Sequence, residues 1–186
     1  MIDGMWDRAI ELHYSRNWTG GFERARWDRG PIHDLPDAFR VLVFNHTPGV
    51  TIHATRCMSQ PQDEDRLELH LMSAPTPHGP RPELVELLTI IAHFHRTGSR
   101  LGLGHTVNFG RPWLPGSSCS HGLVSLPYLD GPDLEWLQDP RIRFLWLIPI
   151  TGAELELKKT HGLEALEERF EAKQFDYLDP RRASVV

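Results

Sequence analysis

The stretch RIRFLWLIPITGAE, residues 141–154, contains the longest apolar run of the chain, Phe144–Ile150, which is broken by Pro149. Residues 142–148 are nearly all apolar, and such a run is typical of a strand buried on both faces at the centre of a sheet. We expect Pro149 to end this strand. Thr151 and Glu154 have the spacing of a capping box, which predicts that a helix begins directly after the strand.

Two earlier segments alternate between apolar and polar side chains. Residues 50–56 and 66–72 show this period of two, which predicts a half-buried antiparallel hairpin joined by a charged loop. The leucines of its second strand would face inward, whereas His53, Glu68 and His70 would lie on the outer, solvated face. Residues 41–44 and 123–126 predict two further short strands.

Three other segments have the periodicity of helices. The first covers residues 6–18, and the last follows the helix breaker Gly162. Residues 82–97 form the second, whose broad apolar face consists of Leu84, Leu87, Leu88, Ile91 and Phe94. The order helix, hairpin strands, helix, strands, two helices predicts an α+β fold with a mostly antiparallel sheet packed by helices.

Length and charge narrow the class of protein. The chain has 186 residues without an internal repeat, and we expect a single domain over residues 1–186 that ends in a polar tail at residues 179–186. Its net charge of −5 argues against direct nucleic-acid binding. Because we find no signal-peptide pattern and no apolar run of about 20 residues, we expect a cytoplasmic protein that does not enter a membrane. Cys57 and Cys119 lie far apart, which indicates reduced thiols.

The glycine-rich stretch at residues 102–122 raises the possibility of catalysis. Cys119 could be a nucleophile with His121 or His105 as its base, which would make the protein a thiol hydrolase. No acidic residue is marked by local spacing to orient the base, and the alternative is a loop whose small residues permit close backbone approach. His93 and His95 are two apart on a helix and cannot bind one metal ion, so we expect no metal site and no cofactor.

Two acidic segments suggest a surface for protein binding. Asp63, Glu64 and Asp65 lie in the hairpin loop, and a second segment contains Asp130, Asp133 and Glu135. If the two share a side they form an acidic patch that could dock a basic partner, and otherwise they serve solubility. Trp113 lies in the stiff, proline-rich segment 111–115 and could be an aromatic anchor for a partner. Other paired carboxylates, such as Glu167 and Glu168, are interpreted as solvated.

The chain resembles the suppressor of fused family in the order and spacing of several short motifs. The resemblance covers about residues 40–182 and is carried by Thr55–Ser59, Leu67–Leu71, Gly104–Val107, Phe144–Thr151 and Gly162–Leu166. The chain departs from the family pattern at Cys57, where a glycine tends to precede the Met-Ser of the hairpin. The proline-rich insert at residues 111–115 also looks particular to this chain.

The resemblance implies an α/β sandwich without enzymatic activity. Animal members bind transcription factors, whereas a single-domain chain looks like the bacterial members, which are often encoded beside toxins and act as immunity proteins. The implied function is to bind a cognate toxin and neutralise it by stoichiometric blocking. The alternatives are the thiol hydrolase and a regulatory binder of a protein other than a toxin. The partner, the binding face and the oligomeric state stay open.

Overall fold

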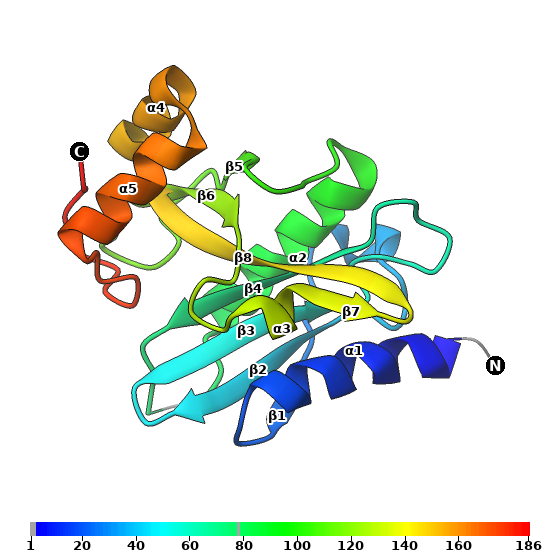
Figure 1. Ribbon diagram of the computed structural model, residues 1–186. Coiled ribbons are helices and arrows are strands. Elements are labelled where there is room, and N and C mark those ends of the chain that lie inside the picture. The colour runs from blue at the N-terminus through cyan, green and yellow to red at the C-terminus, as the bar shows by residue number, and fades with distance from the viewer. Residues whose placement is uncertain (1–2, 78) are drawn as a thin grey trace.

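The computed structural model describes residues 3–77 and 79–186 and has an eight-stranded sheet at its centre (Figure 1). The single-domain prediction also covers Met1, Ile2 and His78, which lie outside the described residues. The spatial strand order is β1-β2-β3-β4-β8-β6-β5, and β7 pairs with the start of β8. The strands are β1 Phe22–Ala25, β2 Arg40–Thr47, β3 Val50–Arg56, β4 Leu67–Ser73, β5 Thr106–Asn108, β6 Cys119–Ser125, β7 Trp136–Gln138 and β8 Arg141–Thr151.

The predicted central strand is confirmed as β8. It pairs in parallel with β4 and antiparallel with β6 and β7, and the other pairings in the sheet are antiparallel. The prediction that Pro149 ends the strand is wrong, because β8 continues to Thr151 opposite β6. The β4 pairing reaches only as far as Trp146, so Pro149 lies where β8 has β6 as its single strand partner. A proline is tolerated there because no ladder hydrogen bond on the other side is lost.

The predicted hairpin is confirmed as β3 and β4, but its outer face is not solvated. Both faces of the sheet are covered, and His53, Glu68 and His70 are each 0% exposed. The register pairs His53 with Leu71 and Ala54 with His70, so the two histidines point to opposite faces. The alternating pattern therefore marks the strands correctly and misses the layer of helices on the second face.

Helices cover both faces of the sheet and form two apolar cores. Helix α2, Pro82–Thr97, matches its predicted bounds and packs on one face with the leucines of β4. Phe94, predicted on its buried side, is 38% exposed. The other face is covered by α1, Asp3–Asn17, and by the C-terminal helices α4, Gly152–His161, and α5, Leu163–Lys173. Two short helical segments, η1 Pro31–Asp34 and α3 Pro132–Glu135, complete the fold.

The start of α4 anchors the C-terminal segment. The predicted capping box is present, because Thr151 Oγ1 accepts from the Glu154 N–H and Glu154 Oε2 accepts from the Thr151 N–H. The same buried carboxylate binds the Arg182 guanidinium at 2.7 and 2.8 Å. Residues 179–186 are therefore more than a polar tail, since Arg182 and Val185 are buried against the sheet.

No helix in residues 3–77 and 79–186 combines the length and the apolar character needed to cross a membrane.

Candidate functional site

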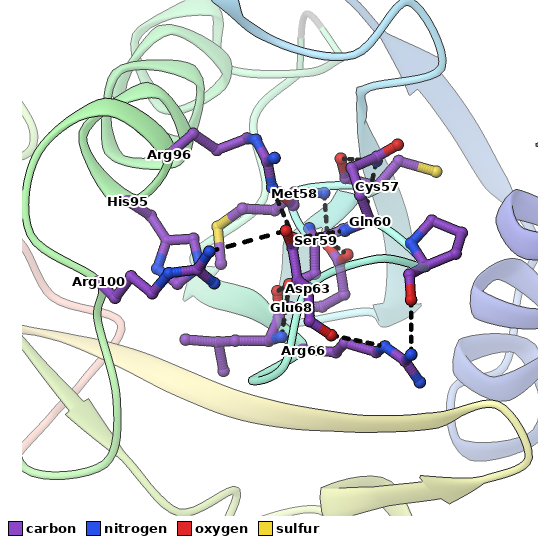
Figure 2. A network of polar contacts seen from close by, with 12 residues as sticks. Cys57, Met58, Ser59, Gln60, Asp63, Arg66, Glu68, His95, Arg96 and Arg100 are labelled. Carbon is purple, nitrogen blue, oxygen red and sulfur yellow. Dashed lines mark hydrogen bonds and ion pairs between the residues drawn. The ribbon is translucent and has the colours of Figure 1, made fainter.

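The loop between β3 and β4 carries the first predicted acidic segment and is held by polar contacts (Figure 2). Asp63 is 6% exposed, so the expectation that it faces solvent is wrong. Its carboxylate accepts hydrogen bonds from the Arg96 guanidinium at 2.6 Å and the Gln60 N–H at 2.8 Å. Burial alone would raise the pKa of Asp63, but these bonds outweigh burial and the pKa is lowered. Asp63 orders the loop, while Glu64 and Asp65 are exposed.

A second carboxylate, that of Glu68, supports the same loop from inside the molecule (Figure 2). It accepts hydrogen bonds from Thr55 Oγ1 at 2.6 Å and from the N–H groups of Met58 and Ser59 at 3.2 Å. Burial raises the pKa of Glu68 to about 7, although these hydrogen bonds favour the charged form. The turn that follows β3 is therefore tied to β4 by one buried side chain.

A cleft of about 810 Å³ lies beside this loop. Its walls are the loop, the segment 100–105 that follows α2, and the hairpin of β7 and β8. Glu64 and Asp65 line it together with cationic or titratable side chains, namely Arg66, Arg100, Arg141, Arg143 and His105. The Trp136 ring lies in the same wall, 4.8 Å from the guanidinium carbon of Arg141. The charge of this cleft is mixed, so it is not the purely acidic patch that the sequence suggested.

The second predicted acidic segment lies on and beside α3, and its three carboxylates have different surroundings. Asp130 is largely buried and accepts a hydrogen bond from Trp18 Nε1 at 2.6 Å. Glu135 is ion-paired with Arg143 at 2.8 Å. Only Asp133 of the three is exposed. Two of these carboxylates therefore hold elements of the fold together, and little free acidic surface is left here.

Trp113 does not form the predicted exposed anchor. Its side chain is 1% exposed and belongs to the core between the sheet and α2. The loop folds back onto its neighbours, because the Trp113 N–H donates to the Cys119 carbonyl at 3.0 Å and Arg111 is ion-paired with Glu86 at 2.7 Å. The proline-rich insert is thus a core-filling loop.

Cys119 and the two candidate bases are not assembled as a catalytic site. Cys119 is 1% exposed in β6, and burial raises the pKa of its thiol, which is opposite to the shift that activates a nucleophilic cysteine. An irregularity in β6 between Cys119 and His121 shifts the strand register, and His121 Nδ1 lies 3.1 Å from Ser120 Oγ. His105 lines the cleft, whose lining does not include Cys119.

The two histidines of α2 have different surroundings, because His95 is buried and His93 is paired with Asp34 at 2.9 Å. Over the described ranges, no group of three or more His, Cys, Asp or Glu side chains is arranged to hold a metal ion.

A second hollow of about 750 Å³, which we call the acidic groove, runs along α5 and was missed by sequence reasoning. The residues that line it are Ser125, Tyr128, Leu129, Trp146, Ile148, Glu164, Glu167, Glu168, Phe170, Glu171, Gln174, Phe175 and Tyr177. The four glutamates have the spacing i, i+3, i+4, i+7, which places them on one face of the helix. This spacing could be seen in the sequence. The groove itself could not, because its apolar wall comes from segments that are distant in the chain.

These features define the class of protein as an α+β fold in which helices cover a mostly antiparallel sheet, as predicted. The suppressor of fused protein family matches residues 36–183, most of the chain, and the chain belongs to this family.

Solved structures share the fold. A suppressor of fused homolog from Neisseria gonorrhoeae is 33% identical, with a TM-score of 0.84 over 97% of each chain. The Sufu–Fu complex contains a chain that is 16% identical, with a TM-score of 0.72 over 97% of this chain and 92% of that one. Drosophila Suppressor of Fused is 18% identical with a TM-score of 0.60, and the match covers 78% of this chain and 42% of that protein.

A curated relative carries a functional name. Immunity protein YqcF from Bacillus subtilis is 39% identical over 68 residues. The match covers 36% of this chain and 35% of that protein, so this chain spans about a third of the length of the relative.

Proposed function

We propose that this protein is an immunity protein that binds a cognate bacterial toxin in the cytoplasm and neutralises it by stoichiometric blocking. The observation that carries the proposal is the 39% identity, over 68 residues, to a protein named as an immunity protein. Membership of the suppressor of fused family over residues 36–183 supports it, because the similarity then lies within a shared fold.

The surroundings of the candidate nucleophile favour binding over catalysis. Burial raises the pKa of Cys119, and the histidine that lines the open cleft, His105, is separate from it. The other cysteine, Cys57, is also buried, and burial raises its pKa as well. A thiol that stays protonated near neutral pH is a poor nucleophile.

The first test is whether a neighbouring gene encodes a toxin domain. A toxin domain found there is then titrated with the purified protein. Growth of cells that express the toxin should be restored by co-expression of this chain. In vitro, toxin activity should fall linearly to an end point at one equivalent, because a blocking protein is consumed by the complex. The Cys119→Ser variant should reach the same end point.

Two results would overturn parts of this proposal. If the neighbouring toxin stays active in the presence of a molar excess of the folded protein, the immunity function is wrong and a regulatory binder of another protein is the remaining binding function. If a small fraction of an equivalent suffices, and Cys119→Ser abolishes the effect, the protein is an enzyme.

A further inference from the structure

The acidic groove combines two chemically different walls. One is the face of α5 that carries Glu164, Glu167, Glu168 and Glu171, which spans eight residues or about 10 Å of helix. The basic residues of the same helix, Arg169 and Lys173, fall on the opposite side by their spacing and do not line the groove. The helix therefore presents a wall of one sign of charge.

The other wall is apolar and aromatic. Trp146 and Ile148 of β8 are almost fully buried at its base, and the Tyr177 ring lies 5.4 Å from the Trp146 ring in an edge-on arrangement. Tyr128 and Leu129, which are neighbours in the chain and both line the groove, are 57% and 53% exposed. Figure 1 shows α5 beside the end of β8, close to the C-terminal segment.

The four carboxylates lack cationic partners in this structure. Within the residues that the structure describes, no ion pair joins any of them to lysine, arginine or histidine, whereas Glu11, Asp63, Glu135 and Glu154 are all paired with arginines. Glu167 accepts a hydrogen bond from Ser125 Oγ at 2.9 Å. Burial and the charge of Glu167 raise the pKa of Tyr128, as expected where negative charge collects. The groove is thus complementary to positive charge.

We propose that the acidic groove is where the protein docks a segment of its toxin that carries apolar side chains flanked by lysine or arginine. This inference rests on the proposed function, since it assigns the binding surface for the toxin. The apolar side chains would contact the exposed Leu129 and Tyr128, and the basic side chains would pair with the glutamates of α5. Desolvated apolar contacts supply most of the affinity at such a surface, and the charges speed association and select the partner.

Two groove variants separate these contributions. The triple variant Glu164→Gln, Glu168→Gln, Glu171→Gln removes three exposed charges and should lower the association rate constant for the toxin about tenfold at low ionic strength. It should also flatten the dependence of that rate on salt. The variant Leu129→Asp should raise the dissociation rate about tenfold or more, because it puts a charge on the apolar rim.

Matched controls remove equal charge or apolar surface elsewhere. The triple variant Glu23→Gln, Asp28→Asn, Asp37→Asn changes the net charge by the same amount at exposed positions that do not line the groove. Met5→Asp alters an apolar side chain on α1 that is 76% exposed. Both controls should bind the toxin with nearly wild-type rate constants, and circular dichroism should show that all variants are folded.

The outcomes distinguish this inference from the proposed function. If the wild-type protein neutralises the toxin and the groove variants behave like their controls, the groove is not the docking surface and the immunity function stands. If the wild type does not neutralise the toxin, the groove can be tested with a fluorescein-labelled amphipathic peptide of leucine and lysine, whose binding to the protein is measured directly. Its binding should be lost in the groove variants and absent for a leucine–glutamate peptide. Binding that the variants leave unchanged would overturn the inference.

Discussion

At the residue scale, Cys57 has a backbone conformation that favours glycine. Its backbone φ is 65°, a left-handed conformation that costs a residue with a Cβ roughly 1–2 kcal/mol and glycine almost nothing. We expect Cys57→Gly to be more stable than Cys57→Ala by about 1 kcal/mol, the reverse of the usual order. Urea denaturation of both variants measures the difference. At the equally buried Cys119 of β6, the alanine variant should be the more stable, and the same order at both positions would contradict this account.

His95 gives the stability of the protein a pH dependence. Its Nδ1 accepts the Leu101 N–H at 2.9 Å, so that nitrogen must be unprotonated, and burial together with Arg100 and Arg96 lowers the pKa of His95 to about 4. The folded-state pKa lies below the unfolded value of 6.5. The stability that the neutral ring contributes is therefore complete above pH 6.5 and is lost as the pH falls towards 4.

The variant His95→Gln isolates this effect, because its amide oxygen can accept the same N–H and does not titrate. Between pH 6.5 and 4, the wild type should lose roughly 3 kcal/mol of unfolding free energy relative to the variant, and above pH 7 the difference should be constant. Urea denaturation at a series of pH values checks this. The opposite contribution of Glu68 cancels in the difference, since both proteins contain it. Parallel pH curves would show that His95 does not titrate in this range.

At the scale of elements, the C-terminal segment depends on one ion pair with the start of α4. The Arg182 and Glu154 side chains are 5% and 0% exposed, so Arg182→Ala leaves a buried carboxylate without its countercharge. We expect a loss of about 3–5 kcal/mol in unfolding free energy, measured by urea denaturation. The neighbouring Arg181 is exposed, and Arg181→Ala should change stability by less than about 0.5 kcal/mol. Equal effects of the two substitutions would mean that the buried pair has no special role.

Elements with strong local signals could be predicted from the sequence. Continuous hydrophobicity identifies β8, Pro82 and the apolar face identify α2, and the capping box identifies the start of α4. Burial of polar side chains could not be predicted in the same way. Thr55 and Glu68 occupy the polar positions of alternating strand patterns, which suggests that they face solvent. In the structure both are buried, and Thr55 Oγ1 donates a hydrogen bond to the Glu68 carboxylate at 2.6 Å. Their partner becomes apparent only when β3 and β4 are paired.

The candidate site was harder to predict than the fold for the same reason. Asp63 and Trp113 lie in loops of polar or proline-rich composition, yet both side chains are buried. Asp63 is paired with Arg96, and Trp113 packs in the core under α2. The acidic groove was missed for a different reason. Glu168 is exposed, as expected, whereas Glu167 is partly buried and accepts a hydrogen bond from Ser125. The glutamates of α5 gain significance only because Trp146 and Leu129 form an apolar wall opposite them.

At the scale of the whole molecule, one sheet separates two apolar cores. One of these cores includes residues that lie outside the family match to residues 36–183. The core under α2 and the core under α1, α4 and α5 share the strands β2, β4, β6 and β8. Helix α1 precedes the matched residues 36–183, but Trp6, Ile10, Tyr14 and Trp18 are all buried in the second core. This arrangement predicts that α1 unfolds together with the sheet.

Two alanine variants test this cooperativity, since Ile10 and Leu88 are each 0% exposed and lie in different cores. Each substitution should lower the unfolding free energy by about 2–5 kcal/mol. Each variant should still unfold in one transition, with the same midpoint by tryptophan fluorescence and by far-ultraviolet circular dichroism. The dependence on urea should keep its wild-type slope, because the surface exposed on unfolding is unchanged. An early, separate transition in Ile10→Ala would instead mean that α1 is an independent unit docked on the family domain.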